Sequence, residues 1–362
     1  MDTFKIPFYV RAAVVFIGLF ALVAMLYIAQ RIIVPIIYST IIAIVLSPIV
    51  DFWVRQKINR TIAIALSIAL VLLSSALFLW LMSSQFGAFT QSFPLLIEKF
   101  TQALDRCTIW ASHYFNISTE NIGAFIAHTK TQILDVGSSA MGETISSIGS
   151  TIMILILIPV YVFMILFYQP LLLDFIRRLF GEGNQKEVDQ ILFSTKTIIQ
   201  RYLIALLIEA AIIATLNSVG LLIIGIDYAI VLGITGALLN VIPYIGGIIA
   251  FALPIIVALV TKSTTTAALL VIAVYSIIQF IDNHYIIPKL VASKVRINAL
   301  IAIIVVLVGG ALWGVPGMFL SIPLTAILKV ICDHIESLKP YGFLLGDTMP
   351  TIAVFKINSK KK

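Results

Sequence analysis

The sequence predicts an all-α polytopic membrane protein with six to eight membrane segments. Of its 362 residues, 60% are hydrophobic and only 11% are charged, and the mean hydropathy is +1.09. A soluble domain carries about 25% charged residues. Apolar runs of the length needed to cross a hydrocarbon core, about 20 helical residues, recur along the chain. They cover 12–29, 32–50, 61–82, 149–168, 203–224, 228–260, 264–281 and 299–330.

The basic residues set the expected orientation in the membrane. The net charge is +7, and the Lys and Arg side chains lie in short loops and at both chain ends. Because cytoplasmic loops carry the excess of these residues, we expect both termini in the cytoplasm. Membrane orientation therefore explains the basic composition without nucleic acid. The first run lacks a small-residue cleavage site, so it predicts a retained helix rather than a signal peptide.

A change of pattern marks an insertion between residues 83 and 148. Leu96, Phe100 and Leu104 recur at helical spacing with charged residues between them, which is typical of an amphipathic helix. We therefore expect a small external helical insertion that lies on or near the membrane surface.

Two of the apolar segments, 228–260 and 299–330, are interrupted by Gly and Pro. Pro removes a backbone donor and clashes with the preceding turn, and Gly adds backbone freedom, so we expect helix breaks at 241–247 and 313–317. The freed backbone groups are tolerated at membrane depth only where protein or a water-filled cavity satisfies them. Paired broken segments indicate the substrate site of a transporter. The alternative is two kinked helices packed through small residues.

The length of the broken segments leaves two topologies open. Each runs about 33 residues, or roughly 50 Å as a straight helix, which exceeds one crossing. If each segment re-enters its own side, Lys289, Lys294 and Arg296 lie inside and Lys262 lies outside. Three bases against one favour such hairpins, which would form an inverted repeat. Long tilted helices explain the length equally well.

Polar groups in two other segments are candidates for function. Glu209 lies well inside the run 203–224, where a carboxylate is expensive and should face the protein interior; the alternative is pairing with Arg201. Asp282, Asn283 and His284 follow the run 264–281, and such groups coordinate cations or relay protons. The alternative there is an ordinary helix end with the aspartate paired to a following lysine.

Several short motifs occur in a characteristic order. They are Pro48-Ile49-Val50-Asp51, Ile242-Pro243-Tyr244-Ile245-Gly246, Asp282-Asn283 followed by Pro288-Lys289, and the run from Gly309 to Gly317 that leads to Ile322-Pro323-Leu324. In order and spacing they resemble the AI-2E (autoinducer-2 exporter, or PerM-type permease) family over nearly the whole chain. The resemblance implies a multi-pass protein of the bacterial inner membrane. Some members of that family are associated with autoinducer-2 export and others with sodium or lithium/proton antiport.

We therefore predict a secondary transporter that exports a small polar molecule or exchanges cations for protons. No G-x-x-x-x-G-K-[ST] loop is present, so an ion gradient or the solute's own gradient would drive it. The alternative is a passive channel or pore formed by an oligomer. The expected partners are membrane lipids and a small polar solute or monovalent cation, with a homo-oligomer left open. The predicted pathway residues are Glu209, Asn240, Pro243, Tyr244, Gly246, Gly247, Asp282, Asn283, Gly314, Pro316 and Gly317.

The sequence offers no catalytic, cofactor or metal site. His-Glu-x-x-His, Gly-x-Ser-x-Gly and Cys-x-x-Cys are all absent, which argues against an enzyme.

The predicted domain organisation has five parts. They are three transmembrane helices in 1–82, the external insertion in 83–148, a fourth transmembrane helix with a cytoplasmic amphipathic segment in 149–202, a transport core in 203–335 and a basic cytoplasmic tail in 336–362.

Overall fold

The computed structural model describes residues 7–115, 144–180, 185–242, 245–262 and 265–348. These residues form helices, and extended backbone pairs in them only at the isolated bridge between Ile297 and Gly346. The helices are α1 (Phe8–Ile28), α2 (Gln30–Arg55), α3 (Arg60–Phe115), α5 (Thr144–Phe167), α6 (Gln169–Leu179), α7 (Gln185–Ile224), α8 (Ala229–Asn240), α9 (Ile245–Thr261), α10 (Thr265–Ile281), the π-helix η2 (Asp282–Ala292), α11 (Ser293–Val295), α12 (Ala299–His334), the 3₁₀ turn η3 (Glu336–Leu338) and α13 (Lys339–Leu345).

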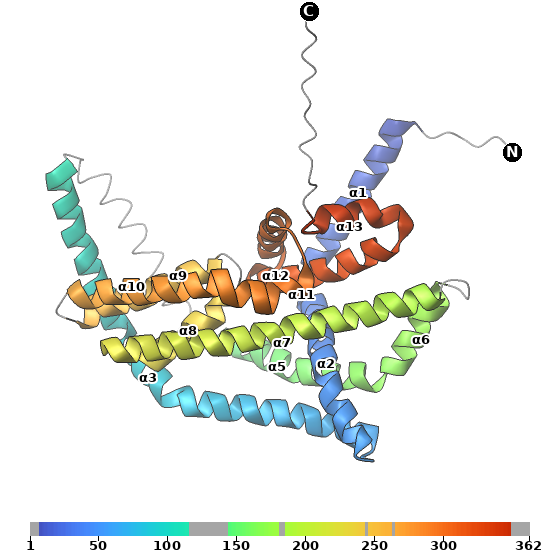
Figure 1. Cartoon of the computed structure of the whole chain (residues 1–362), viewed down its shortest axis with the longest axis horizontal. Helices are drawn as coiled ribbons and strands as arrows, with labels where there is room; N and C mark the ends of the chain where they lie inside the picture. The colour runs from blue at the N-terminus through green and yellow to red at the C-terminus, as the bar shows by residue number, and fades with distance from the viewer. Residues whose placement is uncertain (1–6, 116–143, 181–184, 243–244, 263–264, 349–362) are drawn as a thin grey trace, which may run out of the picture.

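The predicted all-α polytopic class is confirmed. Within the described residues, six helical stretches are long and apolar enough to cross a membrane, and the pair α5 and α6, bent by 64°, adds a seventh if it counts as one span. The six are α1, α2, the first part of α3 (Arg60–Ser83), α7, the stretch Thr266–Val295 of α10, η2 and α11, and α12. α1 extends away from the other helices (Figure 1) with an exposed apolar surface.

Two helices run further than the apolar runs predicted. α3 continues from the expected third span to Phe115, across the predicted start of the external insertion; residues 116–143 of that insertion lie outside the described residues. α7 joins part of the predicted cytoplasmic amphipathic segment to the fifth apolar run in one helix of 40 residues. The physical reason is that α7 contains neither Gly nor Pro before Gly220, so nothing interrupts its hydrogen-bond ladder.

The first broken segment folds back as a helical hairpin. α8 ends at Asn240 and α9 begins at Ile245, so the predicted break is confirmed. Gly236 faces Ala250 across the two helices, and Gly246 lies directly against the carbonyl group of Leu239. With 12 and 17 residues, the arms are about 18 and 26 Å long, each shorter than a bilayer core.

The second broken segment also turns back on itself. At Gly314 the backbone has φ +64° and ψ −146°, a conformation that other residues rarely adopt. Gly309 lies against Gly317 and Ser321, and Gly310 lies against Met318. Residues eight apart in a straight helix are about 12 Å apart along its axis. Although α12 has the length and composition of one span, it is therefore a hairpin.

The tip of the second hairpin docks on the first two helices. The indole Nε1 of Trp313 donates a hydrogen bond to the carbonyl oxygen of Leu26 in α1 (3.1 Å), and the Tyr38 hydroxyl of α2 donates to the carbonyl oxygen of Pro316 (3.2 Å). The Tyr38 ring also stacks on Phe319. These contacts attach the turn at Gly314 to the N-terminal helices.

α7 is the central helix of the structure. It runs across the body of the molecule, with α10 alongside it (Figure 1). One buried cluster joins α7 to the first hairpin and α10, and a second joins it to α2, η2 and the second hairpin. Gly233 of α8 lies against Ser218 of α7 with no room for a side chain. Close packing of this kind brings α7 and the first hairpin into direct backbone contact.

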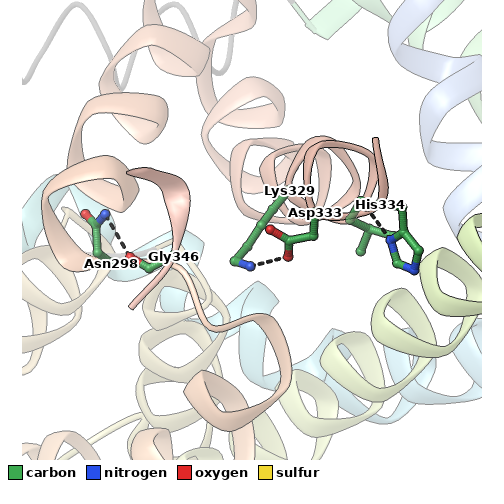
Figure 2. Close-up of polar contacts among 6 residues, drawn as sticks. Asn298, Lys329, Asp333, His334 and Gly346 are labelled. Atoms are coloured by element: carbon green, nitrogen blue, oxygen red, sulfur yellow. Dashed lines mark hydrogen bonds and ion pairs between the residues drawn. The ribbon is translucent and has the colours of Figure 1, made fainter. Parts of the chain in front are cut away.

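A clasp formed by Asn298 holds the C-terminal end of α13 against the base of the second hairpin (Figure 2). The Asn298 side chain donates hydrogen bonds to the carbonyl oxygens of Leu344 (2.6 Å) and Gly346 (3.1 Å). Its Oδ1 accepts from the backbone N–H of Ile301 (2.9 Å) and so caps α12. Figure 2 also shows the ion pair of Lys329 with Asp333 on the other arm of α12.

We expect Asn298→Ala to weaken this clasp. The variant loses a helix cap, worth about 1 kcal/mol, and two hydrogen bonds, worth about 1 kcal/mol each. The unfolding midpoint in detergent should fall, and α13 should become accessible to protease. Asn298→Asp is the matched control, because it keeps the cap acceptor and loses only the donors. Its unfolding midpoint should lie between those of the wild type and the alanine variant. An alanine variant as stable as the wild type would contradict the clasp.

Candidate functional site

A cavity of about 1010 Å³ lies between α7, the tip of the first hairpin, α10 and the start of α12. This volume lies at the upper end of the range of small-molecule sites. Apolar side chains such as Leu206 and Phe251 form part of the wall. Its polar side chains come from α7, α8, α10, η2 and the residue after Gly346. They are Tyr202, Glu209, Asn240, Ser276, Gln279, Asn283, His284 and Asp347.

Asn240 and Asp282 connect the tip of the first hairpin to α10. Asn240 is the last residue of α8, and its amide Nδ2 donates a hydrogen bond of 2.8 Å to Oδ2 of Asp282. Asp282 follows the last residue of α10 and is fully buried. Its burial follows from its register, because Ile278, one turn earlier, packs against Ile213 of α7 and Ala237 of α8. The predicted alternative, in which Asp282 pairs with a lysine, is not the arrangement observed.

Oδ1 of Asp282 is buried and lacks a hydrogen-bond partner within the described chain. Oδ1 of Asn217 on α7 is another such atom, although Asn217 does not line the cavity. Buried polar atoms are usually paired, and each exception requires an explanation such as a function or a bound water or ion. Glu209, eight residues before Asn217 on α7, is 4% exposed and makes no ion pair with any described residue, including Arg201. The site therefore holds carboxyl oxygens that form no ion pair with the described side chains.

The structure places the predicted site residues in three groups. Glu209, Asn240, Gly247 and Asn283 line the cavity, and Asp282 lies behind Asn240. Gly246 is buried inside the first hairpin, and Pro243 and Tyr244 lie outside the described residues. Gly314, Pro316 and Gly317 belong to the second hairpin tip and do not line the cavity.

The sequence analysis missed several cavity residues on α10. Ser276 and Gln279 line the cavity together with Asn283. Their spacing, i, i+3 and i+7, places them on one face of a helix. A polar stripe in an apolar span was therefore the signal that indicated this wall.

The described side chains that line the cavity include acids but no Lys or Arg. Their carboxyl groups are those of Glu209 and Asp347, and His284 supplies an imidazole. His284 is exposed, and its Nδ1 lies 3.0 Å from the carbonyl oxygen of Phe280. A wall of this composition favours a neutral polar or cationic guest over an anion.

The spans, the hairpins and the polar cavity define a polytopic α-helical membrane protein of the transporter class. Comparison with known proteins agrees with this class. The chain belongs to the AI-2E family of transporters, because the model of that family matches residues 16–337. The resemblance found in the sequence motifs is therefore confirmed.

Two of the relatives named below align with this chain over most of their length, and a third aligns over a shorter part. The AI-2 transport protein TqsA of Escherichia coli is 24% identical, with 88% of this chain and 90% of that protein aligned. A Haemophilus influenzae protein named for transport is 28% identical over 88% of this chain and 91% of its own length. YrrI of Bacillus subtilis, also named for transport, is 31% identical over 37% of each chain.

Proposed function

We propose that this protein is a secondary transporter of the inner membrane and that a small polar solute binds in the cavity beside the first hairpin. The observation that carries the proposal is the position of the helix break. The backbone interrupted after Asn240 lies at the wall of a polar cavity. Interrupted backbone at membrane depth is stable where it faces such a cavity, and transporters place their substrates there.

The arrangement of the two hairpins supports alternating access. α10 and η2 form one long span between them, so the first hairpin would enter from the side where α10 begins and the second from the side where η2 ends. Hairpins that enter from opposite sides form the inverted repeat of many transporters. If both termini lie in the cytoplasm, as the basic residues predict, the end of the cavity that Asp347 lines would face the cytoplasm.

We propose export as the direction of transport and a small polar molecule similar to autoinducer-2 as the substrate. The support is kinship with TqsA, which is named an AI-2 transport protein, together with a cavity wall rich in amide and hydroxyl groups. Exchange of a monovalent cation for protons is the second candidate, because Glu209 and Asp282 are buried acids close to the cavity.

Flux through purified protein in proteoliposomes tests the proposal. The interior is loaded in turn with an autoinducer-2-like furanose, sodium or a pH dye, and flux is measured against solute concentration. We expect saturable flux of the furanose. Gln279→Leu should reduce it about tenfold, since one lost hydrogen bond is worth about 1.4 kcal/mol. Gln190→Leu, an exposed position near the start of α7, is the matched control and should not change it.

The remaining outcomes separate the alternatives. Flux that rises linearly without saturation would contradict a carrier and indicate a pore formed by an oligomer. Proton movement driven by sodium, with no furanose flux, would overturn export in favour of cation/proton exchange. Wild-type protein that moves none of these solutes would overturn the proposed transport of all of them.

A further inference from the structure

Glu209 and Asp282 are two carboxylates buried at the same junction of helices. Glu209 is 4% exposed and Asp282 is 0% exposed. Glu209 belongs to α7, and Asp282 follows the last residue of α10. Asn240 links them in space, because it lines the cavity together with Glu209 and donates its hydrogen bond to Asp282. Ile213, Ala237 and Ile278, which lie one helical turn from Glu209, Asn240 and Asp282 respectively, pack against one another in one buried cluster.

Among the described residues, no base forms an ion pair with either acid. The cavity wall carries no Lys or Arg among its described residues, and neither acid makes an ion pair there. The other titratable groups that face the cavity are Tyr202 on α7, His284 on η2 and Asp347 after α13; the described lining residues of the first hairpin and of α12 add none. Two buried like charges without a counter-ion strongly disfavour ionisation of both.

The hydrogen bonds leave Oδ1 of Asp282 open to a proton. Oδ2 of Asp282 accepts the N–H of Asn240, whereas Oδ1 of Asp282 is buried and has no partner. A proton on this carboxyl group would remove the negative charge that has no counter-ion. When it leaves, the O–H bond breaks, both electrons stay on the carboxylate and a water in the cavity accepts the proton.

We propose that Glu209 and Asp282 share a single proton and form the proton-binding site of the transport cycle. This inference deepens the proposed function, and the role of the pair in a transport cycle rests on that function. Binding of the proton itself does not require a transported solute. Gain and loss of the proton change the charge that Asn240 contacts. The protonation state of the pair thereby acts on the tip of the first hairpin.

Infrared difference spectroscopy of the full-length protein in liposomes tests the pair directly. A protonated carboxylic acid has a carbonyl stretching band distinct from that of a carboxylate, and exposed acids are ionised well below neutral pH. In the wild type we expect such a band from one group at neutral pH, lost on alkalinisation. Glu209→Gln and Asp282→Asn should each move its midpoint to lower pH by about one unit or more, because the repelling neighbour is gone.

Three further variants complete the design. The double variant Glu209→Gln with Asp282→Asn should lack the band. Glu187→Gln, which removes an exposed carboxylate near the start of α7 that does not line the cavity, should leave it unchanged. Asn240→Ala should move the midpoint to higher pH, since the lost hydrogen bond favours the ionised form.

Each outcome is decisive, and the wild-type measurement needs no variant to fold. Absence of the band at neutral pH, or its survival in the double variant, would overturn the shared proton. A band that appears only after sodium is removed would overturn it in favour of a bound alkali cation. If the band behaves as expected while proteoliposomes show no flux, the result contradicts the proposed transport but supports the proton site. Normal flux without the band contradicts the proton site alone.

Discussion

Gly246→Ala is expected to prevent the first hairpin from closing. A methyl group at this position would overlap the carbonyl group of Leu239 on the opposite arm. The obstacle is backbone rather than a side chain that can rotate, so the arms must separate. Overpacking of this kind costs about 3 kcal/mol, the upper end of its usual range. The unfolding midpoint in detergent should fall strongly, and flux should be lost because α8 no longer places Asn240 against Asp282.

The neighbouring glycine is the matched control for this variant. A methyl group on Gly247 would meet only the side chains of Asn240 at 3.3 Å and Gln279 at 3.6 Å, and both can shift by a few tenths of an ångström. We expect Gly247→Ala to fold with a midpoint close to that of the wild type. Equal midpoints for the two alanine variants would contradict the close contact at Gly246.

Gly317→Ala is expected to open the second hairpin in the same way. Its methyl group would overlap the carbonyl oxygen of Gly309 and crowd Cβ of Trp313 at 2.9 Å. The cost is again about 3 kcal/mol, and the hydrogen bond from Trp313 to α1 should be lost with it. The decrease in unfolding midpoint and the increase in Trp313 accessibility to a quencher measure this effect.

Gly310→Ala provides the comparison on the same hairpin. Its methyl group would meet only the side chain of Met318, at 2.6 Å from Cε. Methionine is unbranched and adapts its rotamer, so the variant should lose little stability. If Gly310→Ala were as damaging as Gly317→Ala, the backbone contact between Gly309 and Gly317 would not be the cause.

Much of the fold was predictable because it depends on local composition. Apolar runs indicated the spans, and Pro243 and Gly314 marked segments where a helix cannot continue undisturbed. The full extent of α7 was not predicted. Charged residues before Arg201 suggested a separate segment, yet charge alone does not end a helix when no Gly or Pro interrupts it.

The candidate site was predictable only in part. Glu209 and Asp282 were identified because a carboxylate in an apolar run is costly and therefore informative. Ser276 and Gln279 were missed, although their helical spacing with the predicted Asn283 was present in the sequence. The symmetry of the two breaks was misleading in one respect, since the second break docks on α1 and α2 instead of lining the cavity.

The sequence by itself determined that this chain is a polytopic membrane protein of the AI-2E family with two broken segments, because hydropathy and backbone conformational limits act within a few residues. The tertiary structure decided which break faces the cavity and which acid the Asn240 amide meets. Asn240 and Asp282 are 42 residues apart. Their contact exists only because the first hairpin folds back between α7 and α10, a result of side-chain packing between helices that no local pattern encodes.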